Sequence, residues 1–490
     1  MKLKVRILRI AAGKPIAFIH EAPAKELGVH IGDRVTLNKN NHRAIAVIDI
    51  AFGFISRSEI AVSQELGEIL GVDSKGYIEV TPTNTAESSE IINEKLECSE
   101  YSASDLEKIM KDIAENRLTE AEIAYFISGV NYCGMSNNEI INMTRAIVKT
   151  GNKLKWSNKI IADKHCIGGI PANRTTPIVV SICAAAGVIM PKTSSRAITS
   201  AAGTADAVES IAPVNLTISQ LKKIVRKTGG CLAWGGSLGL APADDKLIRV
   251  EKLLRIDPEP QLLASILAKK VAVGSTHVLI DIPYGETAKV SRSRANHLKK
   301  MFESLGKKLG LKIKVLITDG RQLIGNGVGP ILEIRDVIKV LKQDNQPKDL
   351  EEKSLLLAGT IIEMVGKSKK GQGIAKAREI MYSGEAYNKF CEIIKAQGGD
   401  PKAWLPEAKF HHSMISKRSG KIGKINNQQI NYLARKAGSP NEKASGLYIY
   451  KHIGEKIKSG EKIITIYAES KEKLNDALKY FKKQKPITIV

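Results

Sequence analysis

Two short stretches of this 490-residue sequence combine residue types that bind anions. The first, DKHCIGGIPANRTTPIVV (163–180), places Lys164 before the paired glycines Gly168 and Gly169 and then enters an apolar run. Lysine supplies a mobile ammonium, and glycines let backbone N–H groups approach a ligand without a Cβ in the way. The apolar run predicts a helix whose N-terminus adds its positive dipole end. Together these features predict a phosphate site, and an ordinary strand-to-helix turn is the alternative.

The second stretch, KTSSRAITSAAGTAD (192–206), surrounds a single arginine, Arg196, with hydroxyl groups. The hydroxyl residues are Thr193, Ser194, Ser195, Thr199, Ser200 and Thr204. Hydroxyls and one guanidinium suit two anions, or one anion and a sugar, better than a single carboxylate. An exposed Ser/Thr-rich turn is the alternative, but the small residues at 197 and 201–203 let the loop pack closely and argue against exposure.

Composition narrows the choice of anion only slightly. Lys and Arg outnumber Asp and Glu by 75 to 51, and the formal net charge is +24. Such an excess attracts polyanions, phosphorylated small molecules and acidic surfaces alike. Aromatic residues form only 5% of the chain, and no basic block is interleaved with the aromatic residues that stack bases. We therefore expect no nucleic-acid partner, and a nucleic-acid-binding protein is the non-enzymatic alternative.

Cysteine usage and hydropathy predict a cytoplasmic protein with no membrane partner. The six cysteines show no CxxC spacing, so they signal neither a disulfide framework nor a zinc site. The N-terminus alternates charged and apolar residues as a strand does, and it lacks the features of a signal peptide. No apolar run approaches the roughly 18 residues of a membrane span. No acidic or histidine cluster suggests a metal, and we expect no cofactor.

The elements that must hold the two loops follow an α/β pattern. Residues 276–285 and 311–320 predict buried strands with a helix between them, and 262–274 predicts a helix. Further upstream, Ser104 or Asp105 is expected to cap one helix, and Thr119 with Glu122 forms the capping box of the next. The sequence at 136–151 predicts a third helix closed by a glycine. Helices on both sides of the α/β region predict a discontinuous helical domain.

The first 80 residues contain an internal echo. LGVHIGDRVTL (27–37) and LGVDSKGYIEV (70–80) share a Gly turn followed by alternating apolar residues, which predicts a small pseudo-symmetric barrel. The echo resembles the double-psi barrel found at the N-termini of some archaeal proteins and AAA ATPases, and a generic β-domain with two similar hairpins is the alternative. The polar stretch at 81–90 predicts a linker.

Four motifs in one order carry a resemblance to a known family. ADKHCIGGI, KTSSRAITSAAGTAD, LLASILAKKVAVGS and GNGVGPILE resemble the thymidine/pyrimidine nucleoside phosphorylases, and most closely their archaeal branch of AMP phosphorylases. The likeness runs from about residue 99 to the C-terminus. It implies reversible phosphorolysis of nucleoside 5′-monophosphates (AMP, and also CMP and UMP) with inorganic phosphate as co-substrate. The products are free base and ribose 1,5-bisphosphate, which implies a role in nucleotide salvage.

The resemblance also implies an α/β fold of the nucleoside phosphorylase type. The expected domains are a double-psi-like β-barrel at 1–84, a helical domain at 98–152 and 242–273, an α/β phosphate-binding domain with a central mixed sheet at 153–241 and 274–345, and a C-terminal α+β lobe at 346–490. A homodimer is the family habit, and the N-terminal barrel adds a surface for a higher homo-oligomer.

Site residues follow from the same resemblance, position by position. Phosphate is expected at Lys164, Ser194 and Thr204. Nucleotide contacts are expected at Gly169, Ser195, Arg196, Ala197, Ile198, Thr199, Ser200, Thr204, Ser265 and Lys289. Lys269 lies four residues after Ser265, so both share one helix face and Lys269 is a possible base contact.

The general acid of the family corresponds to Asp257, which would protonate the departing base. Asp257 precedes Pro258, however, and an N-cap aspartate followed by an N1 proline is the structural alternative. A helix N-terminus lowers the pKa of a carboxyl group, whereas an acid catalyst needs that pKa raised. The two roles therefore conflict.

The chain departs from the bacterial pattern in two places: the first removes one phosphate hydroxyl, and the second favours the nucleotide branch. Bacterial members carry Ser where this chain has Cys166, and they have a His-Thr-Gly-Gly-Thr run within the region that here reads 199–204. A thymidine or pyrimidine nucleoside phosphorylase is the nearest alternative. An anthranilate-type phosphoribosyltransferase shares the architecture but binds diphosphate through Mg²⁺, and the sequence lacks acidic motifs for that ion.

Overall fold

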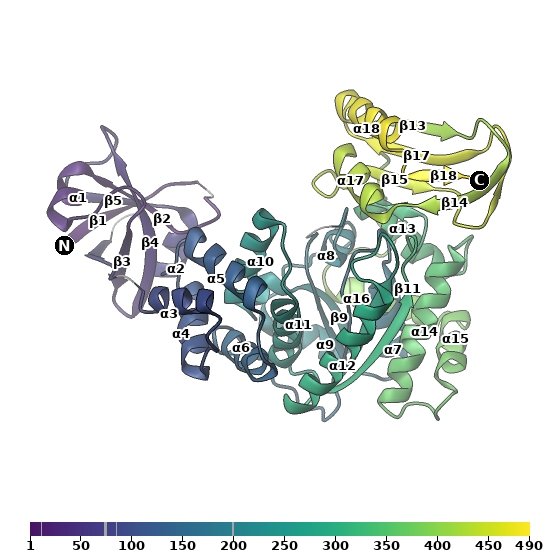
Figure 1. Ribbon diagram of the computed structural model, residues 1–490, viewed down its shortest axis with the longest axis horizontal. Coiled ribbons are helices and arrows are strands. Elements are labelled where there is room, and N and C mark those ends of the chain that lie inside the picture. The colour runs from purple at the N-terminus through teal and green to yellow at the C-terminus, as the bar shows by residue number, and fades with distance from the viewer. Residues whose placement is uncertain (11, 73–75, 85, 198–199) are drawn as a thin grey trace. The chain divides into compact units, whose positions relative to one another are not determined.

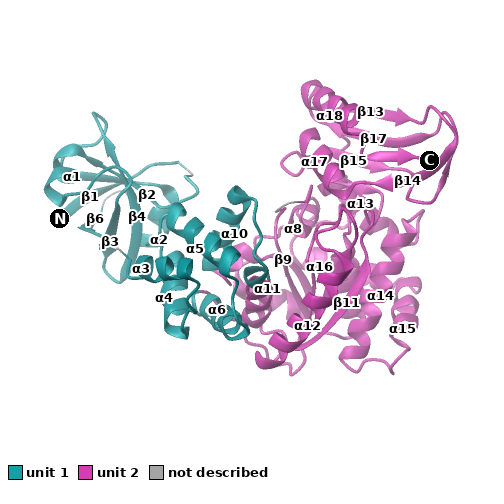
Figure 2. Ribbon diagram, in the orientation of Figure 1, with its two compact units in different colours: residues 1–150, 242–262 teal, residues 151–241, 263–490 magenta. Residues whose placement is uncertain are grey.

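The computed structural model describes residues 1–490 except 11, 73–75, 85, 198 and 199 (Figure 1). It divides into two compact units (Figure 2). Unit 1 comprises Met1–Thr150 and Pro242–Leu262, and unit 2 comprises Gly151–Ala241 and Leu263–Val490. A discontinuity is present, because residues 242–262 belong with the N-terminal 150 residues, but the second helical segment expected at 242–273 is shorter, since residues 263–273 belong to unit 2.

Unit 1 begins with a closed six-stranded barrel. Its strands are β1 (Lys2–Ile7), β2 (Ile16–His20), β3 (Arg34–Lys39), β4 (His42–Ala51), β5 (Glu59–Val62) and β6 (Tyr77–Pro82), in the order β1-β5-β2-β4-β3-β6. β1 pairs with β5 and β2 with β4 in parallel, while the other pairs are antiparallel. Alternate residues of β1 face a fully apolar interior. The expected barrel is confirmed, and its closure leaves no open strand edge.

The sequence echo corresponds to a repeated helix-turn-strand unit. Helices α1 (Glu21–Leu27) and α2 (Gln64–Leu70) end at Gly28 and Gly71, whose φ angles of 67° and 58° are left-handed. Glycine adopts this conformation without steric cost and so stops a helix. β3 and β6 follow the two turns and pair with each other. The polar stretch at 81–90 is a shorter linker than expected, because β6 ends at Pro82 and the next helix begins at Ser88.

A helical bundle completes unit 1. It consists of α3 (Ser88–Glu94), η1 (Lys95–Glu97), α4 (Ala103–Ala114), α5 (Glu120–Cys133), α6 (Asn137–Lys149) and α10 (Pro242–Leu254). The capping box of Thr119 and Glu122 on α5 is confirmed. The cap of α4 was predicted wrongly: Ser102 is its N-cap, and Asp105 is the reciprocal acceptor three residues later. α6 ends at Lys149 with Thr150 as its C-cap, one residue before the glycine expected to close it.

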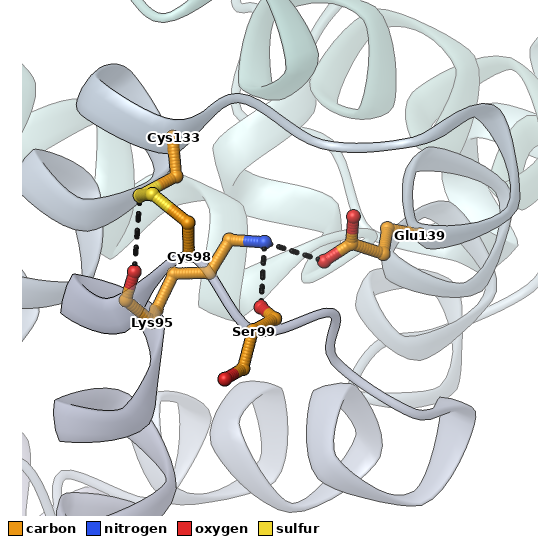
Figure 3. Close-up of a disulfide and its surroundings, with 5 residues drawn as sticks. All are labelled: Lys95, Cys98, Ser99, Cys133 and Glu139. Carbon is orange, nitrogen blue, oxygen red and sulfur yellow. Dashed lines mark hydrogen bonds and ion pairs between the residues drawn. A yellow bond between two sulfur atoms is a disulfide. The ribbon is translucent and has the colours of Figure 1, made fainter.

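A disulfide joins Cys98 to Cys133, contrary to the expectation from cysteine spacing (Figure 3). The two residues are 35 positions apart, and their Cα atoms lie 5.2 Å apart because the turn after η1 packs on the end of α5. Beside the bond, the buried Lys95 Nζ donates to Glu139 Oε1 at 2.7 Å and to Ser99 O at 3.1 Å (Figure 3). Disulfides are typical of oxidising compartments, so the cysteines no longer support the expected cytoplasmic location.

Unit 2 contains the α/β domain. Its elements are β7 (Ala162–Cys166), α7 (Thr175–Ala185), β8 (Met190–Ser194), α8 (Thr204–Val208), α9 (Ile218–Thr228), β9 (Gly230–Trp234), η2 (Gly235–Leu238), most of α11 (Glu259–Val273), β10 (His277–Tyr284), α12 (Arg292–Lys308), β11 (Lys312–Asp319), β12 (Gly327–Val328), α13 (Pro330–Lys342), α14 (Lys348–Met364), α15 (Gly373–Tyr382) and α16 (Glu385–Ala396). The strands expected at 276–285 and 311–320, and the helix between them, are present as β10, β11 and α12; β10 is buried as expected, whereas in β11 only Val315 is buried.

The described strand pairs within this domain are parallel, not mixed as expected, and only β12 pairs antiparallel, with β15 of the C-terminal lobe. β7 pairs with β10, and β10 with β11, while β8 pairs with β9. Ala162 N donates to Ile189 O at 2.9 Å, which joins the beginnings of β7 and β8. The carboxyl ends of these two strands therefore lie at one edge, where ligands bind in parallel α/β sheets. Both anion-binding stretches of the sequence begin in these strands.

Helix α7 is buried along almost its whole length and forms the centre of the core. Side chains of α14, α15 and α16 lie in the same apolar cluster as those of α7 and β8. The sequence-based boundary at 346 assigned these three helices to the C-terminal lobe, but their burial places them in the α/β core. The apolar faces of these helices pack in the same cluster as α7 and β8, and the sequence alone does not identify that packing partner.

The C-terminal lobe has a separate apolar cluster. Its elements are β13 (Phe410–Ile415), β14 (Gly420–Ile425), α17 (Asn427–Ala437), β15 (Gly446–Ile449), β16 (Lys456–Ile457), β17 (Lys462–Ala468), α18 (Lys471–Gln484) and β18 (Ile487–Ile489). One sheet has the order β12-β15-β17-β13, so β12 of the α/β domain extends it. Within the described residues, the helices are too short or too polar to cross a lipid bilayer.

Candidate active site

Lys164 occupies a buried position in the middle of β7. Its Nζ donates to Thr175 Oγ1 at 2.6 Å and to Thr176 Oγ1 at 3.3 Å, in the first turn of α7. Burial lowers the pKa of Lys164, and Asp281 opposes that shift. An ammonium, two hydroxyls and the N-terminus of an eleven-residue helix thus meet at one point. The two threonines were not among the predicted site residues, although both lie within the quoted stretch.

The backbone between Lys164 and α7 is strained. Gly168 and Gly169 have φ angles of 91° and 89°, and Ala172 and Asn173 also lie in the left-handed region at 59° and 41°. Such conformations cost on the order of 1–3 kcal/mol for a residue with a side chain, and they concentrate at functional sites. A Cβ on Gly169 would lie 2.9 Å from Lys289 N. Gly169 therefore allows close approach of Lys289, so two predicted nucleotide contacts are neighbours.

The second loop folds back on itself around Asp206. Asp206 Oδ2 accepts hydrogen bonds from Ala197 N at 2.7 Å and Gly203 N at 2.8 Å. A Cβ on Gly203 would lie 2.5 Å from Ser195 O, so glycine is required for this closure. Ser194 Oγ is buried and has no hydrogen-bond partner among the described residues. A buried hydroxyl without a partner is costly, and a bound anion would satisfy it.

Arg196 is already paired, although it was expected to contact the nucleotide. Its guanidinium donates to both carboxylate oxygens of Glu209 at 2.6 and 2.8 Å and lies 3.3 Å from Asp206. It also lies 4.9 Å from the centre of the Trp234 ring. Hydrogen bonding from Arg196 lowers the pKa of Glu209 to about 2. Arg196 therefore stabilises the loop through its contacts with the carboxylates of Asp206 and Glu209.

Further residues of this loop were predicted to contact the nucleotide. Ser200 Oγ donates to Ala202 O at 2.7 Å, and Ser195 is exposed. Ile198 and Thr199, predicted as nucleotide contacts, lie outside the described residues. The nucleotide roles assigned to this loop stay predictions.

On α11, Lys269 Nζ donates to Ser265 Oγ at 3.2 Å, which confirms that the two residues share one helix face.

Burial lowers the pKa of His165, near the end of β7, well below its ordinary value, and the charges of Lys270, Lys192, Lys269 and Lys164 lower it further. His165 is therefore neutral near pH 7. A neutral imidazole with a depressed pKa is a poor proton donor.

Buried ion pairs surround these residues. Asp163 pairs with Lys270 at 2.7 Å and Lys192 at 3.4 Å, and Asp281 pairs with Lys353 at 3.1 Å. Burial lowers the pKa of Lys270 to about 8. With Lys164, four lysines face two aspartates, so the site carries excess positive charge in a low-dielectric interior, which favours an anion. No cluster of three or more metal-ligating side chains occurs within the described residues.

Asp257 belongs to unit 1 and is exposed, immediately before α11. The first helical hydrogen bond of α11 runs from Leu262 N to Pro258 O at 2.9 Å. Asp257 thus lies directly before the first turn of α11, and its role as a helix cap stays a prediction. The assignment of Asp257 as general acid stays a prediction.

Three domain families match the chain. Residues 89–151 match the helical bundle domain of a glycosyl transferase family, 158–387 match the α/β domain of that family, and 421–488 match the pyrimidine nucleoside phosphorylase C-terminal domain. The middle match ends within α16, which agrees with the core membership of α14 and α15.

Similar proteins cover nearly the whole chain. The AMP phosphorylases of Thermococcus sibiricus and Pyrococcus furiosus are 41% and 40% identical, over 100% of this chain and 98% of each relative. A Hahella chejuensis protein, provisionally named a thymidine phosphorylase, is 41% identical over 94% of this chain and 92% of its own length. The anthranilate phosphoribosyltransferase of Thermus thermophilus has a TM-score of 0.54 at 17% identity, over 63% of this chain and 99% of that protein. That last likeness concerns the fold alone.

Proposed function

This chain belongs to the pyrimidine nucleoside phosphorylase family, and we propose that it is an AMP phosphorylase. The substrates are a nucleoside 5′-monophosphate and inorganic phosphate, and the products are free base and ribose 1,5-bisphosphate. The observation that carries the proposal is the buried Lys164 of β7, whose ammonium contacts two hydroxyls at the N-terminus of α7. The identity of about 40% to archaeal AMP phosphorylases, which includes the N-terminal barrel, supports the choice of a nucleotide.

In the proposed reaction, phosphate is bound by Lys164, Ser194, Thr204 and the first turn of α7. One phosphate oxygen forms a bond to C1′ of the ribose as the bond from C1′ to the base nitrogen breaks. The base leaves with that electron pair and takes a proton from Asp257. The rate arises from orientation and from fixed charge placed against an oxocarbenium-like transition state.

The nucleotide is proposed to lie along the remaining predicted residues. Gly169 and Lys289 lie together and form one part of its site, and Ser265 with Lys269 forms another. The paired Arg196 contacts Asp206, which holds the described ends of the loop together at Ala197 and Gly203.

One assay tests the proposal and its alternative. The protein is incubated with inorganic phosphate and AMP, CMP, UMP, adenosine, thymidine or uridine, and base release is followed. An AMP phosphorylase releases base from monophosphates and leaves the nucleosides intact. A thymidine or pyrimidine nucleoside phosphorylase is favoured by the provisional name of the Hahella relative, and efficient thymidine cleavage would establish that function instead.

We also propose that the chain forms a homodimer, and a higher oligomer through its barrel. Light scattering of the full chain tests this, because a mass equal to the single-chain value of 53.3 kDa would contradict association.

A further inference from the structure

The motif GNGVGPILE (325–333) has no role in the proposed reaction, yet its last residue reaches the site. Glu333, in the first turn of α13, is 1% exposed. Its Oε2 accepts a hydrogen bond from Arg174 Nε at 2.6 Å and lies 2.5 Å from Nη2 of the same guanidinium. Its Oε1 accepts a hydrogen bond from Gly329 N at 3.1 Å. Glu333 therefore fixes the plane of the Arg174 guanidinium relative to the motif.

The same guanidinium reaches the second loop. Arg174 Nη1 donates to Thr204 Oγ1 at 2.8 Å, and Nη2 donates to Ala202 O at 2.9 Å. Arg174 itself follows the strained Ala172 and Asn173, and its backbone caps α7. One buried side chain thus joins both anion-binding loops and the GNGVGPILE motif, which are remote from one another in the sequence.

We infer that Arg174, held by Glu333, is a positioning residue that orients the Thr204 hydroxyl toward the phosphate. A threonine hydroxyl has one hydrogen to donate and two lone pairs that accept. The Arg174 N–H occupies an acceptor position, so the Thr204 hydrogen points away from the guanidinium and is available to an anion. The inference rests on the proposed phosphate site, and it assigns Arg174 no direct contact with substrate.

A purely structural ion pair is the alternative, because a buried arginine and glutamate hold segments together whatever binds nearby. The two explanations differ in how Arg174 and Thr204 combine. If the arginine acts through the hydroxyl, its replacement has little further effect once the hydroxyl is absent. If it acts only on the fold, the two replacements contribute independently.

The experiment is a double-mutant cycle read out as the affinity for inorganic phosphate alone, measured by titration calorimetry. Arg174→Gln and Thr204→Val should each weaken phosphate binding about tenfold or more, and the double variant should bind no more weakly than the weaker single variant. Thr204→Ser keeps the hydroxyl and should retain affinity within about twofold of the wild type. Multiplicative effects in the double variant, or unchanged affinity in a folded Arg174→Gln, would overturn the inference.

Arg174→Lys is a second variant that keeps the inference testable if Arg174→Gln does not fold. The lysine keeps a cation beside Glu333, but it cannot reproduce the fork that reaches both Glu333 and Thr204. Weakened phosphate binding with a preserved thermal midpoint supports the inference, and wild-type phosphate affinity overturns it. Because these titrations contain no AMP, a wild-type protein that binds phosphate but releases no base from AMP contradicts only the proposed function.

Discussion

Replacing Lys164 with methionine separates a role in phosphate binding from a role in folding. The side chain is 2% exposed, and its ammonium donates to the hydroxyls of Thr175 and Thr176 at distances of 3.3 Å or less. In the proposed complex the ammonium also donates to phosphate. A hydrogen bond between two charged groups contributes about 1.5–3 kcal/mol. Since about 1.4 kcal/mol corresponds to a tenfold change, the Kd and KM for phosphate should rise about 10- to 150-fold.

The free energy of unfolding should change far less than the phosphate affinity. Methionine is unbranched and only one heavy atom shorter than lysine, and it removes the cost of burying a charge, a cost that also lowers the pKa of Lys164. Against this gain, two hydrogen bonds to hydroxyls are lost, at about 0.5–1.5 kcal/mol each. These opposing contributions should keep the thermal midpoint, measured without phosphate, within a few degrees of the wild type.

The assay combines phosphate titration calorimetry with the kinetics of base release from AMP. Lys370→Met is the matched control, because Lys370 is exposed and its loss also lowers the net charge from +24 to +23. The control should behave as the wild type. A folded Lys164→Met that binds phosphate within twofold of the wild type would refute the assignment.

Three other predictions concern separate parts of the molecule. Asp257→Asn should lower kcat for AMP by about 10²–10⁴-fold with a thermal midpoint close to that of the wild type, because Asp257 is exposed and asparagine caps a helix about as well as aspartate; normal turnover would exclude it as the acid. The folded-state pKa of Glu209 is lowered to about 2, so the stability from its pair with Arg196 is present above pH 4.5 and lost as the pH falls toward 2. Urea unfolding should show the gap between wild type and Glu209→Gln closing across that window, and a constant gap would contradict the pairing. Cys98→Ser should lower the free energy of unfolding by about 4 kcal/mol through its 35-residue separation from Cys133, and reduction of the wild type should reproduce the loss; unchanged stability would show that the bond is absent in solution.

Helices, strands and turns were predictable from the sequence where residue composition and periodicity indicate the same element. β10 and β11 are rich in Val, Ile and Leu and are each followed by a glycine, and α7 is an apolar run that begins with two threonines. Each pattern stays the same whatever packs against it, so composition and periodicity identify the element. The repeated Gly turns of the barrel are equally local, because a left-handed φ suits glycine in any context.

Features that depend on remote partners were not predictable. Cys98 and Cys133 are brought together by the packing of η1 on α5, and nothing in their spacing indicates it. The helices at 348–396 are amphipathic in any assignment, and only the shared core with α7 assigns them to the α/β domain. The end of β7 and the end of β8 meet through sheet order, which a single sequence does not specify.

Within the candidate site, the sequence identified residue types correctly but not how their charges are distributed. Arg196 looked like a ligand for an anion, yet two carboxylates within fourteen residues of it already hold its guanidinium. Arg174 was not among the predicted site residues, yet its guanidinium joins Thr204 to Glu333, which lies 159 positions after Arg174. A guanidinium that is neutralised inside its own loop can stiffen that loop, whereas one shared between a remote carboxylate and a site hydroxyl can set the direction in which that hydroxyl donates. The partner of each arginine, rather than its distance in sequence from the anion-binding motif, therefore determines which of the two can tune phosphate affinity.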